Sequence, residues 1–251
     1  MTEVDKKLFD KNNHYMGRPA DFDTKFIQWR LEFLKADKDF LDKNLEMIDI
    51  GCGNGATMFG IASEMKSIVG VDINDDHQQV FENYKKENNI DNCSFEVFDI
   101  ENETYPRKFD RLTSFEVIEH LEDDANVKKM SEMLTDDGIA VFSVPNKWWI
   151  FETHGANLPL LPWNRVPFFS WLPRPIHEKY ANAGIYTQKR FRKLLENNGF
   201  EILEMRLMTA PMDVLKKDNG LKRFVTKYIF KSKETNTPFL AVSIYVKAKK
   251  K

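Results

Sequence analysis

The chain has 251 residues, of which 42% are hydrophobic and 30% charged, and its formal net charge is −2. The length favours one α/β domain, residues 1–251, and the composition excludes a largely disordered chain. The near-balance of charge disfavours a nucleic-acid binder that works by bulk positive charge. Cys52 and Cys93 are the two cysteines, too few for a disulfide framework or a four-thiolate metal site. A reducing cytosol is therefore the expected compartment.

The first residues are polar and lack the apolar core of a secretory signal. No run of 18 apolar residues occurs, so we expect no membrane-spanning helix and a cytoplasmic protein. Residues 1–43 are expected to form an N-terminal arm or lid followed by a helix over 22–43. In this helix Phe22, Phe26, Trp29 and Phe33 recur at helical spacing.

Strand and helix patterns alternate from residue 45 onward. Strands are expected at 45–50, 67–73, 93–98, 109–115, 138–144, 200–207 and 238–246. Helices are expected at 56–65, 75–87, 124–134, 187–198 and 221–231. This alternation predicts a mostly parallel seven-stranded sheet with helices on both faces.

Two stretches interrupt the alternation. Residues 146–185 contain four of the five tryptophans and five of the ten prolines and show no clear periodicity. An irregular segment of this length inside a compact domain usually forms a lid or a binding element. Residues 209–237 form a second insertion, which includes the helix expected at 221–231.

A glycine-rich turn follows the first strand and reads Gly51-Cys-Gly-Asn-Gly55. Asp72 lies 21 residues after Gly51, where its carboxylate could bind both hydroxyls of a ribose. The alternative is a simple chain reversal. The looser dinucleotide fingerprint is also satisfied, but Asp49 at the end of the strand suits a cationic ligand group better than a pyrophosphate. No Gly-Lys-Ser/Thr phosphate loop is present, which disfavours nucleotide hydrolysis.

Residues 45–145 resemble the class I S-adenosylmethionine-dependent methyltransferases, particularly quinone-biosynthesis O-methyltransferases. The resemblance rests on Met47-Ile-Asp-Ile-Gly-Cys-Gly-Asn-Gly55, Val69-Gly-Val-Asp-Ile73, Phe98-Asp-Ile100, Phe109-Asp-Arg-Leu-Thr-Ser-Phe-Glu-Val-Ile-Glu-His-Leu121 and Leu134-Thr-Asp-Asp-Gly-Ile-Ala-Val-Phe142. It implies a Rossmann-like sheet with an antiparallel seventh strand and S-adenosylmethionine as the cofactor.

The same resemblance implies a set of cofactor-binding residues. Asp49 would lie near the amino group, Asp72 would hold the ribose, and Asp99 would meet the adenine amino group. Cys52 in the turn is interpreted as a packing residue rather than a nucleophile. The full set is Asp49, Gly51, Cys52, Gly53, Gly55, Asp72, Ile73, Asp99, Ile100, Phe115 and Glu116.

His120 is the candidate catalytic base, because an imidazole titrates near neutrality. The alternative is that it caps a turn. Glu116, Glu119 and His120 could instead bind a divalent cation, with His154 or His177 as a further ligand, although no metal is assigned from the sequence. The absence of an Asn/Asp-Pro-Pro-Tyr/Phe motif disfavours amide or adenine nitrogen as the acceptor, so oxygen is expected.

The 146–185 insertion follows strand five, where the family commonly builds its acceptor site. Trp148, His154 and Tyr186 are the candidate substrate-binding residues for a small, partly apolar acceptor of lipid, quinone or glycan type. The alternative is a small core that buries its own aromatics. The helix at 221–231 is basic and amphipathic, which fits either a membrane surface or a solvated face. RNA methylation and a non-catalytic partner subunit remain alternative functions, and no oligomeric state is predicted.

Overall fold

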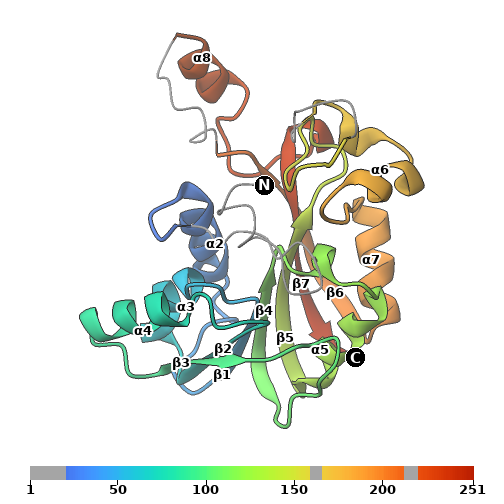
Figure 1. Cartoon of the computed structure of the whole chain (residues 1–251). Helices are drawn as coiled ribbons and strands as arrows, with labels where there is room; N and C mark the ends of the chain where they lie inside the picture. Colours follow the sequence, from blue (N-terminus) through green and yellow to red (C-terminus); the bar gives the residue numbers. More distant parts are fainter. Residues whose placement is uncertain (1–20, 159–165, 212–219) are drawn as a thin grey trace.

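A seven-stranded sheet forms the centre of the protein, in the order β3-β2-β1-β4-β5-β7-β6 (Figure 1). The structure is a computed structural model that describes residues 21–158, 166–211 and 220–251. Strand β7 is antiparallel to both β5 and β6, whereas β1 to β5 pair in parallel. The predicted fold class is therefore confirmed, while the arm or lid expected in residues 1–20 lies outside the described residues.

The strands and helices alternate along the chain as βαβ units require. The strands are β1 (Glu46–Ile50), β2 (Ser67–Asp72), β3 (Cys93–Val97), β4 (Phe109–Phe115), β5 (Leu134–Pro145), β6 (Phe200–Thr209) and β7 (Ala241–Lys250). The α-helices are α2 (Lys25–Ala36), α3 (Ala56–Ile61), α4 (Gln78–Glu87), α5 (Val127–Glu132), α6 (Arg174–Tyr180), α7 (Gln188–Asn197) and α8 (Gly220–Tyr228). Short 3-10 turns include η2 (Ile118–His120) and η3 (Asp124–Asn126). No helix within these described residues is both long and apolar enough to cross a membrane.

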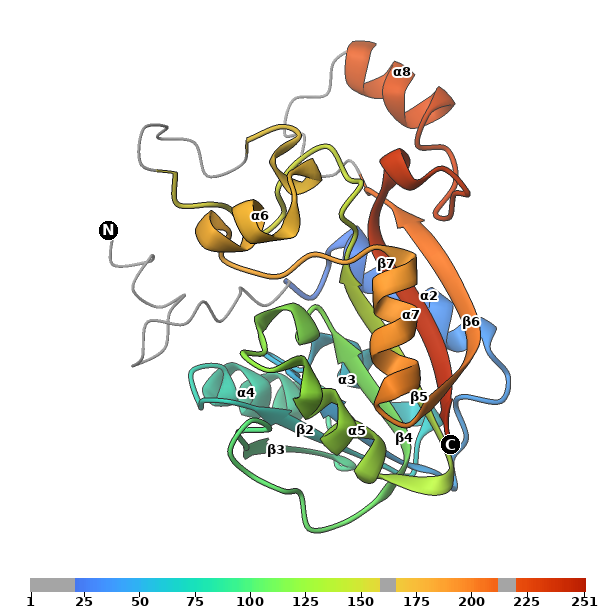
Figure 2. The same ribbon diagram turned by 90° about the vertical axis from the view of Figure 1, so that its right-hand side faces the viewer.

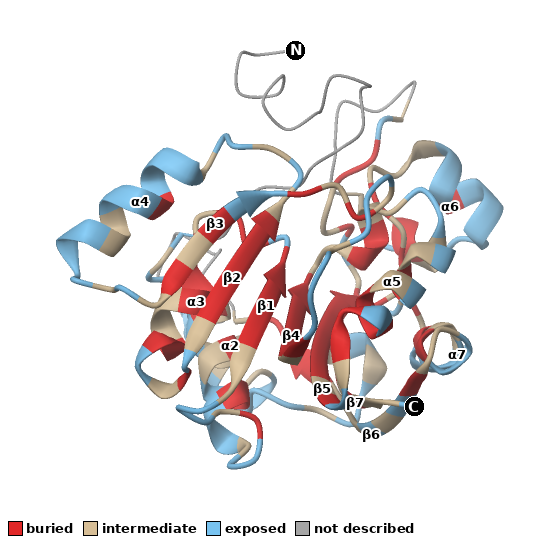
Figure 3. Cartoon of the chain, turned by 90° about the horizontal axis from the view of Figure 1, so that it is seen from below, coloured by how far each residue is buried: buried red, intermediate tan, exposed pale blue. Residues whose placement is uncertain are grey.

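Helices cover both faces of the sheet, because successive strand side chains point to opposite sides. Ile48 and Ile50 of β1 pack with the apolar residues of α5 and α7, whereas Met47 packs with those of α2 and α3. Figure 2 shows α5 and α7 lying across the same face. Figure 3 shows the buried central strands between largely exposed outer helix surfaces.

Helix α2 is shorter than the helix expected at 22–43. The Thr24 hydroxyl accepts the Ile27 N–H and starts the helix, which ends at Ala36. The next residues turn because the buried Arg111 guanidinium of β4 donates to the carbonyl oxygens of Asp39 and Phe40, at 2.7 and 2.8 Å. Tertiary hydrogen bonds therefore override the helical pattern.

Other element boundaries also differ from the prediction. Strand β5 already begins at Leu134, which shortens the helix expected at 124–134 to α5. The 146–185 insertion, which showed no periodicity, contains α6. Strand β7 runs to Lys250 instead of ending at residue 246, and Lys249 pairs with Asp137 at 2.9 Å. The basic C-terminal residues thus belong to the sheet because β5 and β6 flank them.

The chain order reverses between β1 and β4, since β2 and β3 lie on one side of β1 and the later strands lie beyond β4. In open α/β sheets ligands bind beyond the carboxyl ends of the strands at such a switch point. Gly51 follows β1 and Glu116 follows β4, so both predicted cofactor segments meet there.

Gly70 in β2 leaves room for Met58 and for Cys52 of the glycine-rich turn to pack closely against its backbone. A Cβ there would lie 2.5 Å from Met58 Sδ and 2.8 Å from Cys52 Sγ. We expect Gly70→Ala to lower the free energy of unfolding by about 1–3 kcal/mol, because overpacking forces these neighbours to move. Urea denaturation measures the change. Gly220→Ala is the control, since a Cβ at Gly220 meets nothing within 4 Å; equal loss in both variants would contradict the prediction.

Candidate active site

The glycine-rich turn leaves β1 and approaches the segment after β4. Gly51, Gly53 and Gly55 have φ angles of 72°, 52° and 80°, in the left-handed region that glycine tolerates best. A Cβ at Gly51 would also collide with the Val117 side chain. The turn therefore needs glycine for both backbone conformation and space.

Asp72, at the end of β2, stabilises this turn through hydrogen bonds. Its carboxylate accepts the Gly53 N–H at 2.8 Å and the Ile73 N–H at 2.9 Å, while burial raises its pKa. Ile73 remains exposed beside it. Asp99 accepts the Glu101 N–H and an Asn102 amide N–H within its own turn. Ile100, which follows this turn's first residue, is buried and packs in the hydrophobic core.

Asp49 is a buried carboxylate at the end of β1. Burial raises its pKa to about 7, although the Thr113 hydroxyl donates to it at 2.6 Å and the positive charge of Arg30 favours its ionised form. Arg30 comes from α2 and is only 9% exposed. Its Nε is buried and makes no hydrogen bond within the described part of the chain.

Phe115 and Glu116 mark the end of β4. The Arg30 guanidinium lies over the Phe115 ring, 4.8 Å from its centroid. Glu116 adopts a φ of 58°, which is uncommon for a residue with a side chain. Its carboxylate accepts the Ser143 hydroxyl at 2.8 Å, and burial raises its pKa. Cys52 is buried as expected of a packing residue, and burial raises the pKa of its thiol.

Glu119, His120 and His154 form a cluster next to Glu116. One potential ligand atom from each lies within 4.8 Å of the other two. His154 Nε2 is 3.6 Å from Glu119 Oε1, and the two imidazole rings are 5.0 Å apart. Burial lowers the pKa of His120 to about 4. Burial, together with the nearby Glu116 charge, holds the pKa of Glu119 well above its usual value.

This cluster can hold a divalent cation, because neutral imidazole nitrogens and a carboxylate are common metal ligands. A buried carboxylate is costly when ionised without a compensating charge, so a cation would suit Glu119. Three protein ligands also leave coordination positions for a substrate. His177, the other histidine considered as a ligand, does not join the cluster.

A buried hydrogen bond instead joins His177 to Glu152. His177 Nε2 and Glu152 Oε2 are 2.6 Å apart, and both side chains are almost completely buried. The other Glu152 oxygen accepts the His154 N–H at 3.2 Å. Asn182 also donates to the His154 carbonyl oxygen at 3.0 Å. The insertion is thereby fixed around His154.

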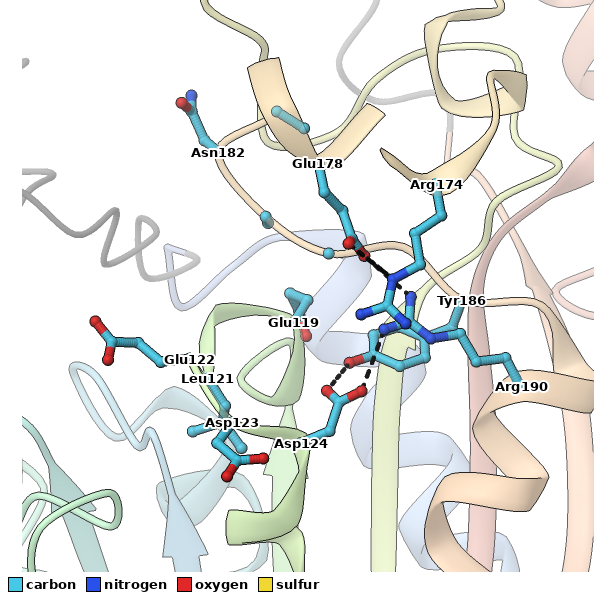
Figure 4. Close-up of a pocket in the computed structure, with 13 residues that line it drawn as sticks. Glu119, Leu121, Glu122, Asp123, Asp124, Arg174, Glu178, Asn182, Tyr186 and Arg190 are labelled. Carbon is cyan, nitrogen blue, oxygen red and sulfur yellow. Dashed lines mark hydrogen bonds and ion pairs between the residues drawn. The ribbon is translucent and has the colours of Figure 1, made fainter. Parts of the chain in front are cut away.

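A cavity of about 430 Å³ opens beside Glu119. Figure 4 shows its lining drawn from the segment around η3, from α6 and from the start of α7. The lining is mostly polar and includes Glu122, Asp123, Asp124, Arg174, Glu178, Asn182, Tyr186 and Arg190.

The structure places the three expected substrate-binding residues in different surroundings, and Tyr186 lines the cavity. The Tyr186 ring is buried, and its hydroxyl donates to Asp124 at 3.0 Å, so this donor is already used. Trp148 packs against Trp171 and Phe239 on the outside of the insertion. His154 alone joins the Glu119 cluster.

Sequence reasoning missed Arg30 and Glu152. Arg30 could have been found, because it is a charged residue inside the apolar stripe that includes Phe26 and Phe33. Glu152 had no such signal, since its partner His177 is 25 residues away and only the fold joins them.

A mostly parallel sheet with a glycine-rich turn and buried acids at its switch point is typical of nucleotide-cofactor proteins of Rossmann-like architecture. The profile of a family described as "Methyltransferase domain" matches residues 41–199. The chain therefore belongs to this family of methyltransferase domains.

Individual relatives agree with this assignment. The ubiquinone biosynthesis O-methyltransferase of Pelagibacter ubique is 29% identical over 133 residues, which cover 51% of this chain and 55% of that protein. The chain therefore spans about half the length of the curated relatives it matches.

Solved structures share the fold at lower identity. An S-adenosylmethionine-dependent methyltransferase from Mesorhizobium loti has a TM-score of 0.62 and 16% identity, covering 92% of this chain and all of that one. Magnesium protoporphyrin IX methyltransferase from Synechocystis PCC 6803, with bound S-adenosylhomocysteine, has a TM-score of 0.55 and 17% identity, covering 90% and 83%.

The Glu152–His177 hydrogen bond should stabilise the insertion. We expect His177→Ala to lower the free energy of unfolding by about 2–4 kcal/mol, because it leaves Glu152 buried without this partner and opens a cavity. Glu178→Ala is the control on the same helix, since its contact with Arg174 is exposed and should contribute less than about 1 kcal/mol. Urea denaturation compares the two, and equal losses would disprove the buried pair's importance.

Proposed function

We propose that the enzyme transfers the methyl group of S-adenosylmethionine to an oxygen of a small acceptor that carries a polar, hydroxyl-bearing end. The Glu119, His120 and His154 cluster carries this proposal, because it brings potential metal ligands together beside the polar cavity. The curated relatives named as ubiquinone biosynthesis O-methyltransferases favour oxygen as the acceptor atom.

The residues at the switch point suit the zwitterionic end of the cofactor. Asp49 would pair with its ammonium group, and Arg30, whose buried Nε has no hydrogen-bond partner among the described residues, would hold its carboxylate. Asp72 and Ile73 would contact the ribose and the adenine. The cofactor supplies an electrophilic methyl group, so these residues need only align it and exclude water.

The pKa of His120 helps to choose between its two proposed roles. A pKa of about 4 makes a weak base at neutral pH but keeps the imidazole uncharged. His120 therefore serves better as a metal ligand, together with Glu119 and His154. A divalent cation held there would lower the pKa of an acceptor hydroxyl. Two imidazole ligands favour manganese or zinc over magnesium.

The cavity beside Glu119 suits the reacting end of the acceptor. Asp124 and Glu178 are already paired with Arg190 and Arg174 in its wall (Figure 4). Hydroxyl groups can bind such a polar surface without carrying a charge of their own. The aromatic side chains farther out in the insertion would contact the apolar part of a lipid, quinone or glycan-type acceptor.

The affinity for S-adenosylhomocysteine should depend on pH through Asp49. Its carboxylate is protonated below a pKa of about 7, and the neutral form cannot pair with an ammonium group. Affinity should therefore fall as the pH drops below 7, approaching about tenfold per pH unit. Thr113→Val removes a donor to the ionised form and should move this fall to higher pH. Calorimetric titration over a range of pH measures the affinity of the wild type and of Thr113→Val. Asp49→Asn should flatten the dependence of affinity on pH. An unchanged dependence in Asp49→Asn would refute the assignment.

Metal binding and methyl transfer should both require the cluster. Calorimetry with Mn²⁺ or Zn²⁺ alone should detect a site that His120→Ala weakens by at least about 100-fold, because a ligand is lost. The same variant should lose transfer of tritiated methyl groups to a panel of catechols, phenols and polyols while keeping its affinity for S-adenosylhomocysteine. His77→Ala lies outside the cluster and should bind metal normally. Full transfer by His120→Ala would reject the proposed role.

A further inference from the structure

Two insertions leave the sheet at the edge that carries the cofactor residues. The 146–185 insertion follows the carboxyl end of β5, which runs parallel to β4 and hence to β1. Strand β6 has the same direction as β5, because both are antiparallel to β7. The segment between β6 and β7, which includes α8, therefore also emerges at this edge. Figures 1 and 2 show α8 and the α6 region at the same end of the protein.

Exposed apolar side chains gather on these two insertions. We define the aromatic patch as Trp148, Phe151, Phe168, Trp171, Leu172 and Phe239. All of these residues except Trp171 have more than a third of their surface exposed. Ring contacts join Trp171 to Trp148, Phe168 and Phe239, so the patch is continuous across both insertions. A contiguous exposed apolar patch of this kind marks an interaction surface.

Helix α8 lies beyond the ends of the strands in both views (Figures 1 and 2). Phe224 and Tyr228 are 55% and 60% exposed, and their rings lie 4.9 Å apart on one side of the helix. Ile229 directly after the helix is also exposed. Aromatic side chains exposed to water have an unfavourable hydration free energy. This face of α8 is therefore suited to burial against another molecule.

The positive charge around α8 indicates that its partner is anionic. Residues 220–231 contain four basic residues and no acidic residue, although the whole chain carries a net charge of −2. Exposed Lys227 lies beside Tyr228, with Nζ 5.4 Å from the ring centroid, and Lys231 follows the helix. Aromatic residues flanked by lysines are typical of helices that lie in the headgroup region of anionic membranes.

We propose that α8 and the aromatic patch dock the enzyme on an anionic phospholipid surface. Phe224, Tyr228 and the patch enter the headgroup boundary, while Lys227 and Lys231 contact lipid phosphates. The cofactor edge then faces the bilayer. Given the proposed function, the acceptor is presented by the membrane: its apolar part stays in the lipid, and its polar end reaches the cavity beside Glu119.

Sedimentation with vesicles tests the docking step without an acceptor. The full chain should sediment with vesicles of phosphatidylglycerol and phosphatidylcholine, and binding should weaken at least tenfold on pure phosphatidylcholine or at high salt. Phe224→Glu with Tyr228→Glu should reduce binding at least tenfold. Leu203→Glu is the matched control, because Leu203 is similarly exposed on edge strand β6. Lys227→Glu should also weaken binding, whereas Lys193→Glu on α7 should not.

The affinity for S-adenosylhomocysteine is measured for every variant and should stay unchanged. This separates the docking surface from the proposed reaction, because loss of docking leaves the cofactor site intact. Absence of sedimentation with anionic vesicles would overturn the proposal. The proposal would also be overturned if the wild-type protein were a dimer in solution and the double variant Phe224→Glu with Tyr228→Glu were a monomer. The α8 face would then bind a second copy of this chain. Equal binding to neutral and anionic vesicles would remove the role of the lysines and reject the proposal as stated.

Discussion

Burial of acidic side chains at the carboxyl edge of the sheet is the constraint on which the site depends. Asp49 and Glu119 are buried there, Glu116 is partly buried beside them, and burial raises the pKa of each. Arg30 from α2 opposes this effect, because its positive charge favours the ionised forms. Both Glu119 carboxylate oxygens lack a hydrogen-bond partner within the described residues. A zwitterionic cofactor and a divalent cation would supply the missing countercharges, so the proposed ligands match what the fold leaves unsatisfied.

The insertion after β5 is part of the same site rather than an appendage. The Glu119 carbonyl oxygen accepts the Gly184 N–H at 2.8 Å, and Glu152 fixes the backbone of His154. These bonds join the loop after β4 to a segment far away in the sequence. The family match covers residues 41–199, and under the proposed function the acceptor side is built from this insertion. Fold alone would therefore not identify the acceptor.

The arrangement also links chemistry to location. Parallel strands bring the cofactor residues, the polar cavity and both insertions to one edge. Under the docking proposal, the surface that meets lipid is the one through which an acceptor enters. The apolar surface that is costly in water would thus help to orient the enzyme, because its burial requires the cofactor edge to face the membrane.

The sequence by itself determined the class of fold and predicted the cofactor segments, since strand periodicity, the turn after Gly51 and the spacing to Asp72 are local patterns. The end of α2 could not be predicted, because Arg111 redirects that segment from β4. Tertiary structure alone decided that His154 joins Glu119 while His177 binds Glu152, and that Tyr186 uses its hydroxyl on Asp124. Such pairings depend on how distant segments pack, and no local pattern in one sequence records them.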